Sequence, residues 1–309
     1  MAAAALAGAA LVYAASTAAE GPEYWLSRLA HAAQSVSFHG EVTHRHGDRV
    51  QSLELARRVG PDGYAERILT LSGSPREVVR DGKTITCVLP AGRERLDGRL
   101  PRNPFPTGWA DPDQLAANYE LLDLGADRVA GRACRVIGVR PRDAFRYGFR
   151  LWVDAETGLL LRSDAVDERG EVVEQVTFTR VSIPAELDPR RVATSLSGTT
   201  VRWKVVGDDA GHIDDLPWMV GALPPGFAAD GIRVREHATT QRVFTDGLAK
   251  VSVFVAPVDS ARKGLAGTSR MGAVSAFGTV IEGHQVTVVG EVPLATVRLI
   301  GESLAFGRR

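Results

Sequence analysis

The chain has 309 residues, of which 44% are hydrophobic and 24% are charged. These are the proportions of an ordinary folded protein, and the length allows a sizeable core and favours two domains. Basic and acidic residues both number 37, so the formal net charge is zero, which argues against a nucleic-acid-binding protein.

The first 19 residues, MAAAALAGAALVYAASTAA, form an alanine-rich apolar run that ends in small residues. This pattern is typical of a secretory signal peptide with a candidate cleavage site at Ser16, Thr17 and Ala18, although the usual basic n-region is missing. The run is too short and too rich in alanine for a membrane span. No cysteine precedes Cys87, so the sequence offers no cysteine for a lipid anchor at the mature N-terminus. We therefore expect an exported, soluble protein.

The region that follows, up to residue 89, predicts one helix and a series of antiparallel strands. The helix covers residues 23–33, where Trp25 and Leu29 recur at helical spacing. Short turns rich in glycine, aspartate and proline separate the extended runs after it, which indicates hairpins. The strands expected here cover residues 36–42, 51–58, 64–71, 77–80 and 84–89.

Residues 90–112 change character, because glycine and proline break any regular pattern while Phe105 and Trp109 lie within the segment. A loop of this length in a compact domain is usually functional or disordered, and the aromatic residues favour a flap docked on the domain. Beyond it, Asp111 is a candidate cap for a second helix over residues 112–122.

The most regular part of the chain runs from residue 127 to 154 and contains two predicted strands, 132–139 and 146–153. Both faces of the second strand carry aromatic or apolar residues, so we expect it to be covered on both sides. Strands over residues 159–165 and 172–181 follow after short turns, which completes an antiparallel meander.

These elements predict an α+β fold whose first domain, residues 20–184, is a twisted antiparallel sheet wrapped around a helix. An apolar concave side would make such a sheet a lipophilic trough. Trp25, Phe149, Leu151 and Trp152 are the candidates for its lining, and the alternative is that they form an ordinary core.

A linker over residues 185–215 precedes the second domain, residues 216–309. The linker contains one extended run, residues 199–206, that can add a strand to a sheet edge. The second domain is predicted to be a small antiparallel α+β unit that ends in a helix opened by Pro293. Its expected strands cover residues 232–239, 243–244, 248–255, 273–281 and 285–289.

The chain has two cysteines, Cys87 and Cys134, and both lie in predicted strands. In an exported protein an even number of cysteines favours a disulfide between them. The alternative is a pair of buried free thiols, because sequence alone does not show that the two Cα atoms are close enough to be bridged.

The sequence contains no serine nucleophile elbow, no Walker loop and no dinucleotide-binding glycine motif. We therefore expect no enzymatic activity and no cofactor. His39, Glu41, His44 and His46 are spaced like metal ligands, but in a strand His39 and Glu41 share one face while the other two share the opposite face. Because a metal needs three or four converging ligands, we expect a polar hairpin end here and no metal site.

Long stretches of both halves resemble the MucB/RseB family. In the first half these are ERILTLSGSPREVVRDG (residues 66–82), DRVAGRACRVIGVRPRDAFRYGFRLWVDAETGLLLRSD (127–164) and EQVTF (174–178). In the second half they are LPPGF (223–227), TDGLAKVSVFV (245–255) and VTVVGEVPLATVRLIGESL (286–304). The resemblance covers nearly all of the chain after the signal peptide, and the linker, especially residues 207–215, is less typical.

The resemblance implies a periplasmic negative regulator of the envelope-stress sigma factor. Such a protein binds the periplasmic part of a membrane-spanning anti-sigma factor, shields it from the site-one protease, and releases it when lipopolysaccharide or misplaced lipid is sensed. The large domain of the family is similar to LolA-type lipoprotein carriers, an open half-barrel around helices. The small domain of the family contributes much of the anti-sigma contact.

For this chain we thus expect an anti-sigma factor and lipid acyl chains or lipopolysaccharide as partners, and we also expect a homo-oligomer. On position alone, the candidates for the partner surface are Phe227, Phe244, Phe254 and the turn of Asp246 and Gly247. The alternative function is a carrier that moves lipoproteins or lipids across the periplasm, although a carrier would need only the first domain.

Overall fold

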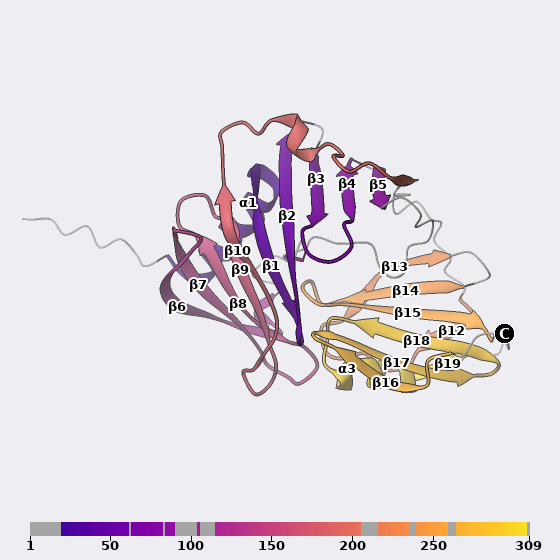
Figure 1. Ribbon diagram of the computed structural model, residues 1–309. Helices are drawn as coiled ribbons and strands as arrows, with labels where there is room; N and C mark the ends of the chain where they lie inside the picture. The colour runs from indigo at the N-terminus through magenta and orange to yellow at the C-terminus, as the bar shows by residue number, and fades with distance from the viewer. Residues whose placement is uncertain are drawn as a thin grey trace, which may run out of the picture.

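The computed structural model describes residues 20–61, 63–82, 84–89, 104–105, 115–204, 216–234, 239–258 and 264–307. The expected signal peptide, most of the expected flap and residues 205–215 of the expected linker lie outside the described residues. Two units follow each other along the chain, the N-terminal unit (residues 20–204) and the C-terminal unit (residues 216–307), and each has its own sheet (Figure 1).

The N-terminal unit is built on an 11-stranded sheet in the order β11-β5-β4-β3-β2-β1-β10-β9-β8-β7-β6. Every pair of neighbouring strands in this sheet is antiparallel, and β1 pairs with β10, so the early hairpins and the later meander join into one sheet. The elements are α1 (Pro22–Ser35), β1 (Phe38–His46), β2 (Arg49–Gly60), β3 (Gly63–Thr70), β4 (Glu77–Asp81), β5 (Thr84–Leu89), β6 (Tyr119–Val129), β7 (Arg132–Pro141), β8 (Gly148–Asp154), β9 (Leu160–Val166), β10 (Val172–Ser182), η1 (Pro189–Val192) and β11 (Thr199–Lys204).

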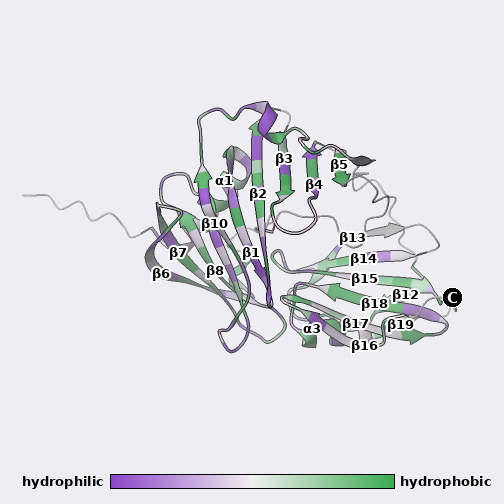
Figure 2. Ribbon diagram, in the orientation of Figure 1, coloured by the Kyte–Doolittle hydropathy of each residue, from purple (hydrophilic) through white to green (hydrophobic). Residues whose placement is uncertain are grey.

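Helix α1 supplies one side of the core of the N-terminal unit. Pro22 suits the first turn of a helix, and Trp25, Leu26 and Leu29 recur at helical spacing and are buried against the sheet. The sheet contributes the alternate residues of its strands, and Figure 2 shows hydrophobic and hydrophilic residues alternating along β1, β2 and β10. The core of this unit therefore lies between the sheet and α1.

The C-terminal unit has a 6-stranded antiparallel sheet in the order β13-β14-β15-β18-β17-β16, covered on one face by α3. Valines on β15 and β18 and the stripe of Val297 and Ile300 on α3 are fully buried together. The elements are β12 (Trp218–Val220), β13 (Ala228–Val234), β14 (Thr240–Thr245), β15 (Lys250–Pro257), β16 (Gly267–Met271), β17 (Val274–Ile281), β18 (His284–Gly290), α3 (Leu294–Glu302) and β19 (Leu304–Phe306), with β12 and β19 forming a separate pair.

Both units thus consist mostly of antiparallel sheet, as the sequence predicts. The extended run in the expected linker does add a strand to a sheet edge, because β11 pairs with β5 along Thr199–Lys204. The expected helix over residues 112–122 is wrong in its second half, since residues 119–122 belong to β6, which pairs with β7. The cross-strand ladder outweighs the helical spacing of the apolar residues in this segment.

The expected disulfide is also wrong, because the structure holds Cys87 and Cys134 as buried free thiols. Cys87 lies on β5 and Cys134 on β7, and β4, β3, β2, β1, β10, β9 and β8 lie between them in the sheet. Neighbouring strands are about 4.8 Å apart, whereas a disulfide needs Cα atoms within about 7 Å. The two thiols pack in different apolar clusters, so each acts as a small core residue.

Candidate functional site

Arg146 lies at the centre of the contact between the two units. It stands in the bend between β7 and β8, and its side chain is fully shielded from solvent. Within the N-terminal unit its guanidinium donates to both carboxylate oxygens of Asp143, over 3.0 Å from Nε and 3.0 Å from Nη2. Towards the C-terminal unit, Nη1 donates to Oδ2 of Asp246 over 2.8 Å, and Nη2 also donates to the carbonyl of Pro225.

Asp246 is the partner of Arg146 from the C-terminal unit, in the turn between β14 and β15. Its Oδ1 accepts hydrogen bonds from the backbone of Leu248 (3.0 Å) and Ala249 (2.7 Å), which fixes the turn. Its Oδ2 accepts from Arg146 and from the hydroxyl of Tyr119, the latter over 2.8 Å. A carboxylate so fully hydrogen-bonded can be buried in its charged form.

Aromatic rings from both units complete this site. The Arg146 guanidinium lies 5.4 Å from the ring centroid of Tyr119, at the start of β6, and 5.3 Å from that of Phe227 in the C-terminal unit. Such cation–π contacts strengthen when the cation is desolvated. Burial, together with the charge of Asp246, raises the pKa of Tyr119 far above its ordinary value, so its hydroxyl stays protonated and remains a donor. We call Tyr119, Asp143, Arg146, Phe227 and Asp246 the joint.

Contacts around the joint extend the boundary between the units. Thr296, in the first turn of α3, donates its hydroxyl to the carbonyl of Phe145 over 2.5 Å. Leu248 packs against the core of the N-terminal unit. Gly226 has φ +78°, a backbone conformation that favours glycine, and a Cβ there would lie 2.1 Å from Nδ2 of Asn118 and would displace that side chain. The two units thus meet at a packed boundary in which these contacts surround the joint.

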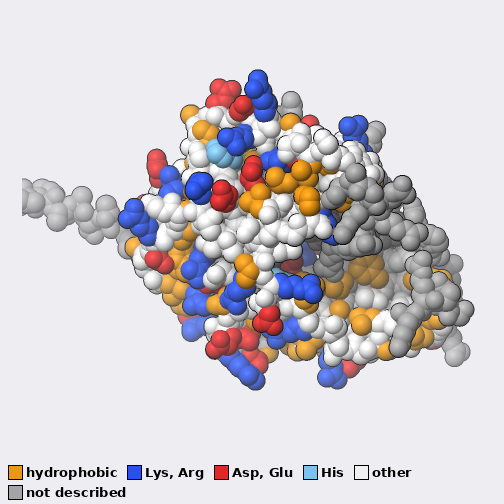
Figure 3. All heavy atoms as spheres, viewed as in Figure 1, with side chains coloured by type: hydrophobic (Ala, Val, Ile, Leu, Met, Phe, Trp, Pro, Cys, Tyr) orange, Lys and Arg blue, Asp and Glu red, His pale blue; other side chains and the backbone are white. Residues whose placement is uncertain are grey.

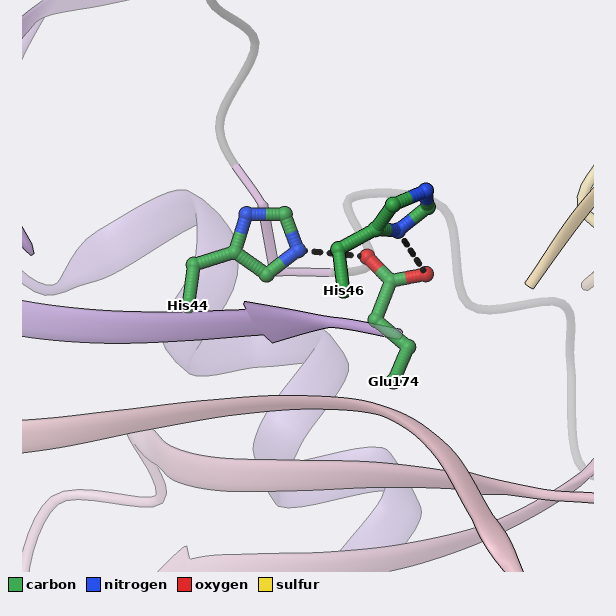
Figure 4. A group of neighbouring side chains, drawn as sticks. All are labelled: His44, His46 and Glu174. Atoms are coloured by element: carbon green, nitrogen blue, oxygen red, sulfur yellow. Dashed lines mark hydrogen bonds and ion pairs between the residues drawn. The ribbon is translucent and has the colours of Figure 1, made fainter. Parts of the chain in front are cut away.

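A second contact between the units lies at the tip of the β1–β2 hairpin. His44 and His46 point to the carboxylate of Glu174 on β10, and His46 abuts Gly272 in the turn between β16 and β17 (Figure 4). His39 and Glu41 do not join this group, and Glu41 instead pairs with Arg180 over 3.4 Å. The separation of the four residues onto two faces is confirmed, but the convergence of Glu174 on His44 and His46 was missed.

The candidates for the lipid trough lie in the core of the N-terminal unit. Trp25, Leu151 and Trp152 are buried members of its main cluster, and Phe149 packs against that cluster. Trp152 also donates its indole N–H to Asp127 over 2.7 Å. Phe105, from the expected flap, is buried in the same cluster and stacks on Phe178 with ring centroids 5.1 Å apart.

The candidates for the partner surface lie in different places. Phe227 and Asp246 belong to the joint, with Gly247 beside it, and Phe244 is buried in the core beneath α3. Phe254 differs from them. In β15 it alternates with Val253 and Val255, which face α3, so it points to the opposite face of the sheet, where it lies between Gln241 and Thr287.

The space-filling view shows how charged and hydrophobic side chains are distributed over one face of the molecule. In Figure 3, charged side chains of both signs are spread over the N-terminal unit, and hydrophobic side chains are visible on the part of the C-terminal unit that is not drawn in grey. Phe254 is half-buried on its face of the sheet. Among the sequence candidates, it is the aromatic side chain best placed to contact another molecule.

The sequence reasoning missed Arg146, Asp143 and Tyr119 as members of a site. One signal was present, because Arg146 interrupts an aromatic run and follows Asp143 at a spacing of three residues in a turn. Its partner in the C-terminal unit is 100 residues away in the chain. No local pattern connects the two positions.

The fold and the joint define a protein of two docked antiparallel units, and comparison with known proteins identifies its family. The family model for the MucB/RseB N-terminal domain matches residues 21–196, and that for the MucB/RseB C-terminal domain matches residues 212–305. The chain belongs to the MucB/RseB family. Among the described residues, no helix is both long and apolar enough to cross a membrane.

Curated relatives and solved structures are similar over almost the whole chain. The sigma factor AlgU regulatory protein MucB of Pseudomonas aeruginosa is 35% identical over 312 residues, which is 97% of this chain and 95% of that protein. The sigma-E factor regulatory protein RseB of Escherichia coli is 28% identical over 294 residues, 91% of this chain and 90% of that protein. The crystal structure of MucB in complex with MucA(peri) aligns with a TM-score of 0.71 at 31% identity, covering 92% of this chain and 98% of that one.

Proposed function

We propose that this protein is a periplasmic regulator that binds the periplasmic segment of a membrane-spanning anti-sigma factor. Bound there, it protects the anti-sigma factor from regulated proteolysis and so keeps the envelope-stress sigma factor inactive. The observation that carries this proposal is the similarity of both units, in order and over 92% of the chain, to a MucB that was solved with MucA(peri).

The proposed contact for the anti-sigma segment is the face of the small sheet opposite α3, around Phe254. Aromatic side chains are enriched at the energetic centres of protein interfaces. Phe254 is flanked across the sheet by Gln241 and Thr287, which offer polar groups at the edge of an apolar contact.

The proposed lipid ligand enters the core of the N-terminal unit, whose sheet curves as a half-barrel around α1. The cluster that includes Trp25 and Leu151 consists of buried side chains packed on one another, so an acyl chain that enters it must displace one of them. Phe105 is the best candidate, because it reaches the core from outside the strands and stacks on one face of Phe178. Removal of that ring would open space for an acyl chain while leaving the sheet intact.

Lipid and anti-sigma segment compete in this proposal, because each prefers a different arrangement of the two units. A ligand shifts such an equilibrium only through its different affinities for the two arrangements. We expect the ligands to act through the joint, because Arg146 and Asp246 are buried only while the units stay in contact. Lipid in the N-terminal core would move the bend that carries Arg146.

Co-purification tests the proposal. Residues 20–309 are incubated with periplasmic and membrane extract, and the bound proteins are identified by mass spectrometry. We expect recovery of a single-span membrane protein that added lipopolysaccharide releases. Phe254→Asp should reduce this recovery. Met219→Asp should not, because Met219, which is 60% exposed in the same unit, lies on β12 outside the six-stranded sheet that carries the proposed contact. Recovery of many lipoproteins without such a membrane protein would contradict the regulator and favour a carrier.

A further inference from the structure

The cluster of His44, His46 and Glu174 is the strongest feature that the proposed function leaves unused. The register of β1 and β10 places His46 directly opposite Glu174 and His44 opposite Val176. His44 and His46 are two residues apart in a strand, so they share a face, and the carboxylate of Glu174 pairs with both. The sheet itself therefore brings two imidazoles and one carboxylate together.

The ligand atoms lie close together, with each histidine beside a different oxygen of Glu174 (Figure 4). All three lie within 4.8 Å of one another: Nε2 of His44 is 2.7 Å from one oxygen of Glu174, and Nδ1 of His46 is 3.4 Å from the other. Bonds of about 2.0–2.1 Å in a tetrahedral site put neighbouring ligand atoms roughly 3.3 Å apart. The pair of His46 and Glu174 already has this spacing, and the pair of His44 and Glu174 needs only a small side-chain rotation.

Nδ1 of His46 gives an independent reason to expect a ligand. This atom is buried, and apart from the long contact with Glu174 at 3.4 Å it makes no hydrogen bond among the described residues. A buried nitrogen held only by so long a contact is incompletely satisfied, and a metal ion would bind it directly. The three side chains are 16–19% exposed, so an ion can reach them and water can complete the coordination.

We propose that His44, His46 and Glu174 bind one divalent transition-metal ion of the Zn²⁺ type, with water in the remaining position. Two imidazole nitrogens and a carboxylate suit Zn²⁺, Co²⁺ or Ni²⁺ better than the oxygen-preferring Mg²⁺ or Ca²⁺. Two arginines nearby, Arg45 and Arg270, direct their guanidinium groups to the carbonyls of Val172 and Gly272, and their positive charge lowers the affinity of the site for a cation.

The site lies at the second contact between the units. Gly272 has φ +57°, and a Cβ there would lie 2.7 Å from both Cε1 and Nδ1 of His46, so the ring of this ligand packs on the backbone of the C-terminal unit. A bound ion would fix the orientation of that ring. The metal site is thus part of the same boundary between the units that contains the joint. The proposal of this site does not depend on the proposed function.

Titration of the metal-free protein tests the site. Residues 20–309, purified without a histidine tag and treated with a chelator, are titrated with ZnCl₂ by calorimetry and with CoCl₂ by visible absorption. We expect one ion per chain and Co²⁺ bands without sulfur-to-metal charge transfer. His46→Gln and Glu174→Gln should each weaken binding by roughly tenfold or more. His39→Gln is the matched control, since His39 lies on the same strand outside the cluster.

Equal Zn²⁺ affinity in the parent, His46→Gln and Glu174→Gln proteins would overturn the proposal, as would the absence of binding in the parent. Circular dichroism and the thermal midpoint confirm that each variant is folded. If a variant does not fold, the histidine resonances of the parent decide the question: those of His44 and His46 should shift on addition of Zn²⁺, while those of His39 should not. Shifts confined to other histidines would contradict the assignment.

Discussion

Arg146 and Asp246 form an ion pair across the two units with both side chains fully buried, and Nη1 lies 2.8 Å from Oδ2. Their charges are compensated by Asp143, the Tyr119 hydroxyl, the Pro225 carbonyl and the backbone of the Asp246 turn. The pair therefore specifies how the units meet, because each charge has its full set of partners only while the units are docked.

Removal of one member of the pair should destabilise the protein strongly. Arg146→Ala leaves Asp246 as an uncompensated buried charge, so we expect a loss of about 3–5 kcal/mol in the free energy of unfolding measured with urea. Arg180→Ala removes the exposed pair with Glu41 and should cost less than about 1 kcal/mol. Equal losses in the two variants would show that the joint does not hold the units together.

We expect Glu77 to make the free energy of unfolding of the protein fall at acid pH. Its carboxylate is buried on β4 and accepts from the backbone of Ser195 and Leu196 and from Nε of Arg67, which ties the segment before β11 to the sheet. Burial pushes its pKa upward, but the hydrogen bonds from Leu196, Arg67 and Ser195 outweigh burial, and the pKa lies below its ordinary value of 4.5.

A lowered pKa in the folded state stabilises the protein above the ordinary pKa, and this contribution is lost as the pH falls through the folded value. Glu77→Gln should therefore cost about 1.5–3 kcal/mol near neutral pH and lose this difference from the parent in acid. Urea unfolding at a series of pH values from neutral to below 4.5 measures it. Glu41→Gln, at an exposed position, should show no such convergence, and a constant offset for Glu77→Gln would refute the assignment.

The cysteines should behave as inert free thiols. Burial raises the pKa of Cys134 to about 11 and also raises that of Cys87, so neither is a thiolate near neutral pH. Ellman's reagent should detect no thiol in the native protein and two after denaturation without reductant, and the thermal midpoint should not change with dithiothreitol. Absence of thiols in the denatured protein would instead indicate a disulfide.

Phe105 should limit the entry of lipid. Phe105→Ala removes a ring that is 7% exposed and stacks on Phe178, so we expect a loss of about 3 kcal/mol in stability together with tighter binding of a fluorescent fatty acid. Leu89→Ala, which truncates a buried side chain in a different cluster, should lower stability without this gain in binding. Unchanged fatty-acid affinity in Phe105→Ala would contradict entry at this position.

The strands could be predicted from the sequence wherever one face is buried and the turn residues are clear. β15 shows this, since Val251, Val253 and Val255 alternate with partly exposed residues and Asp246 and Gly247 mark the preceding turn. β16 was missed because all of its residues are exposed, so it has no hydrophobic alternation to detect. Its place in the sheet is set by the ladder with β17.

The candidate site could be predicted only in fragments. The sequence placed His44 and His46 on one face, but Glu174 is 130 residues from His44, and only the pairing of β1 with β10 brings it there. Asp246 was a candidate for the partner surface on position alone, yet the structure buries it against Arg146. The first contact depends on strand pairing within the N-terminal unit and the second on how the two units dock, and no local periodicity encodes either.

The most direct test of the regulator is a binding titration with its proposed partner. A fluorescent peptide covering the periplasmic segment of the anti-sigma factor from the same organism is titrated with residues 20–309, and lipopolysaccharide is then added. The account predicts saturable binding that is weakened by Phe254→Asp and reversed by lipopolysaccharide. Failure of the peptide to bind the folded protein would contradict the central claim. Peptide binding that lipopolysaccharide leaves unchanged would show that lipopolysaccharide does not release the anti-sigma factor.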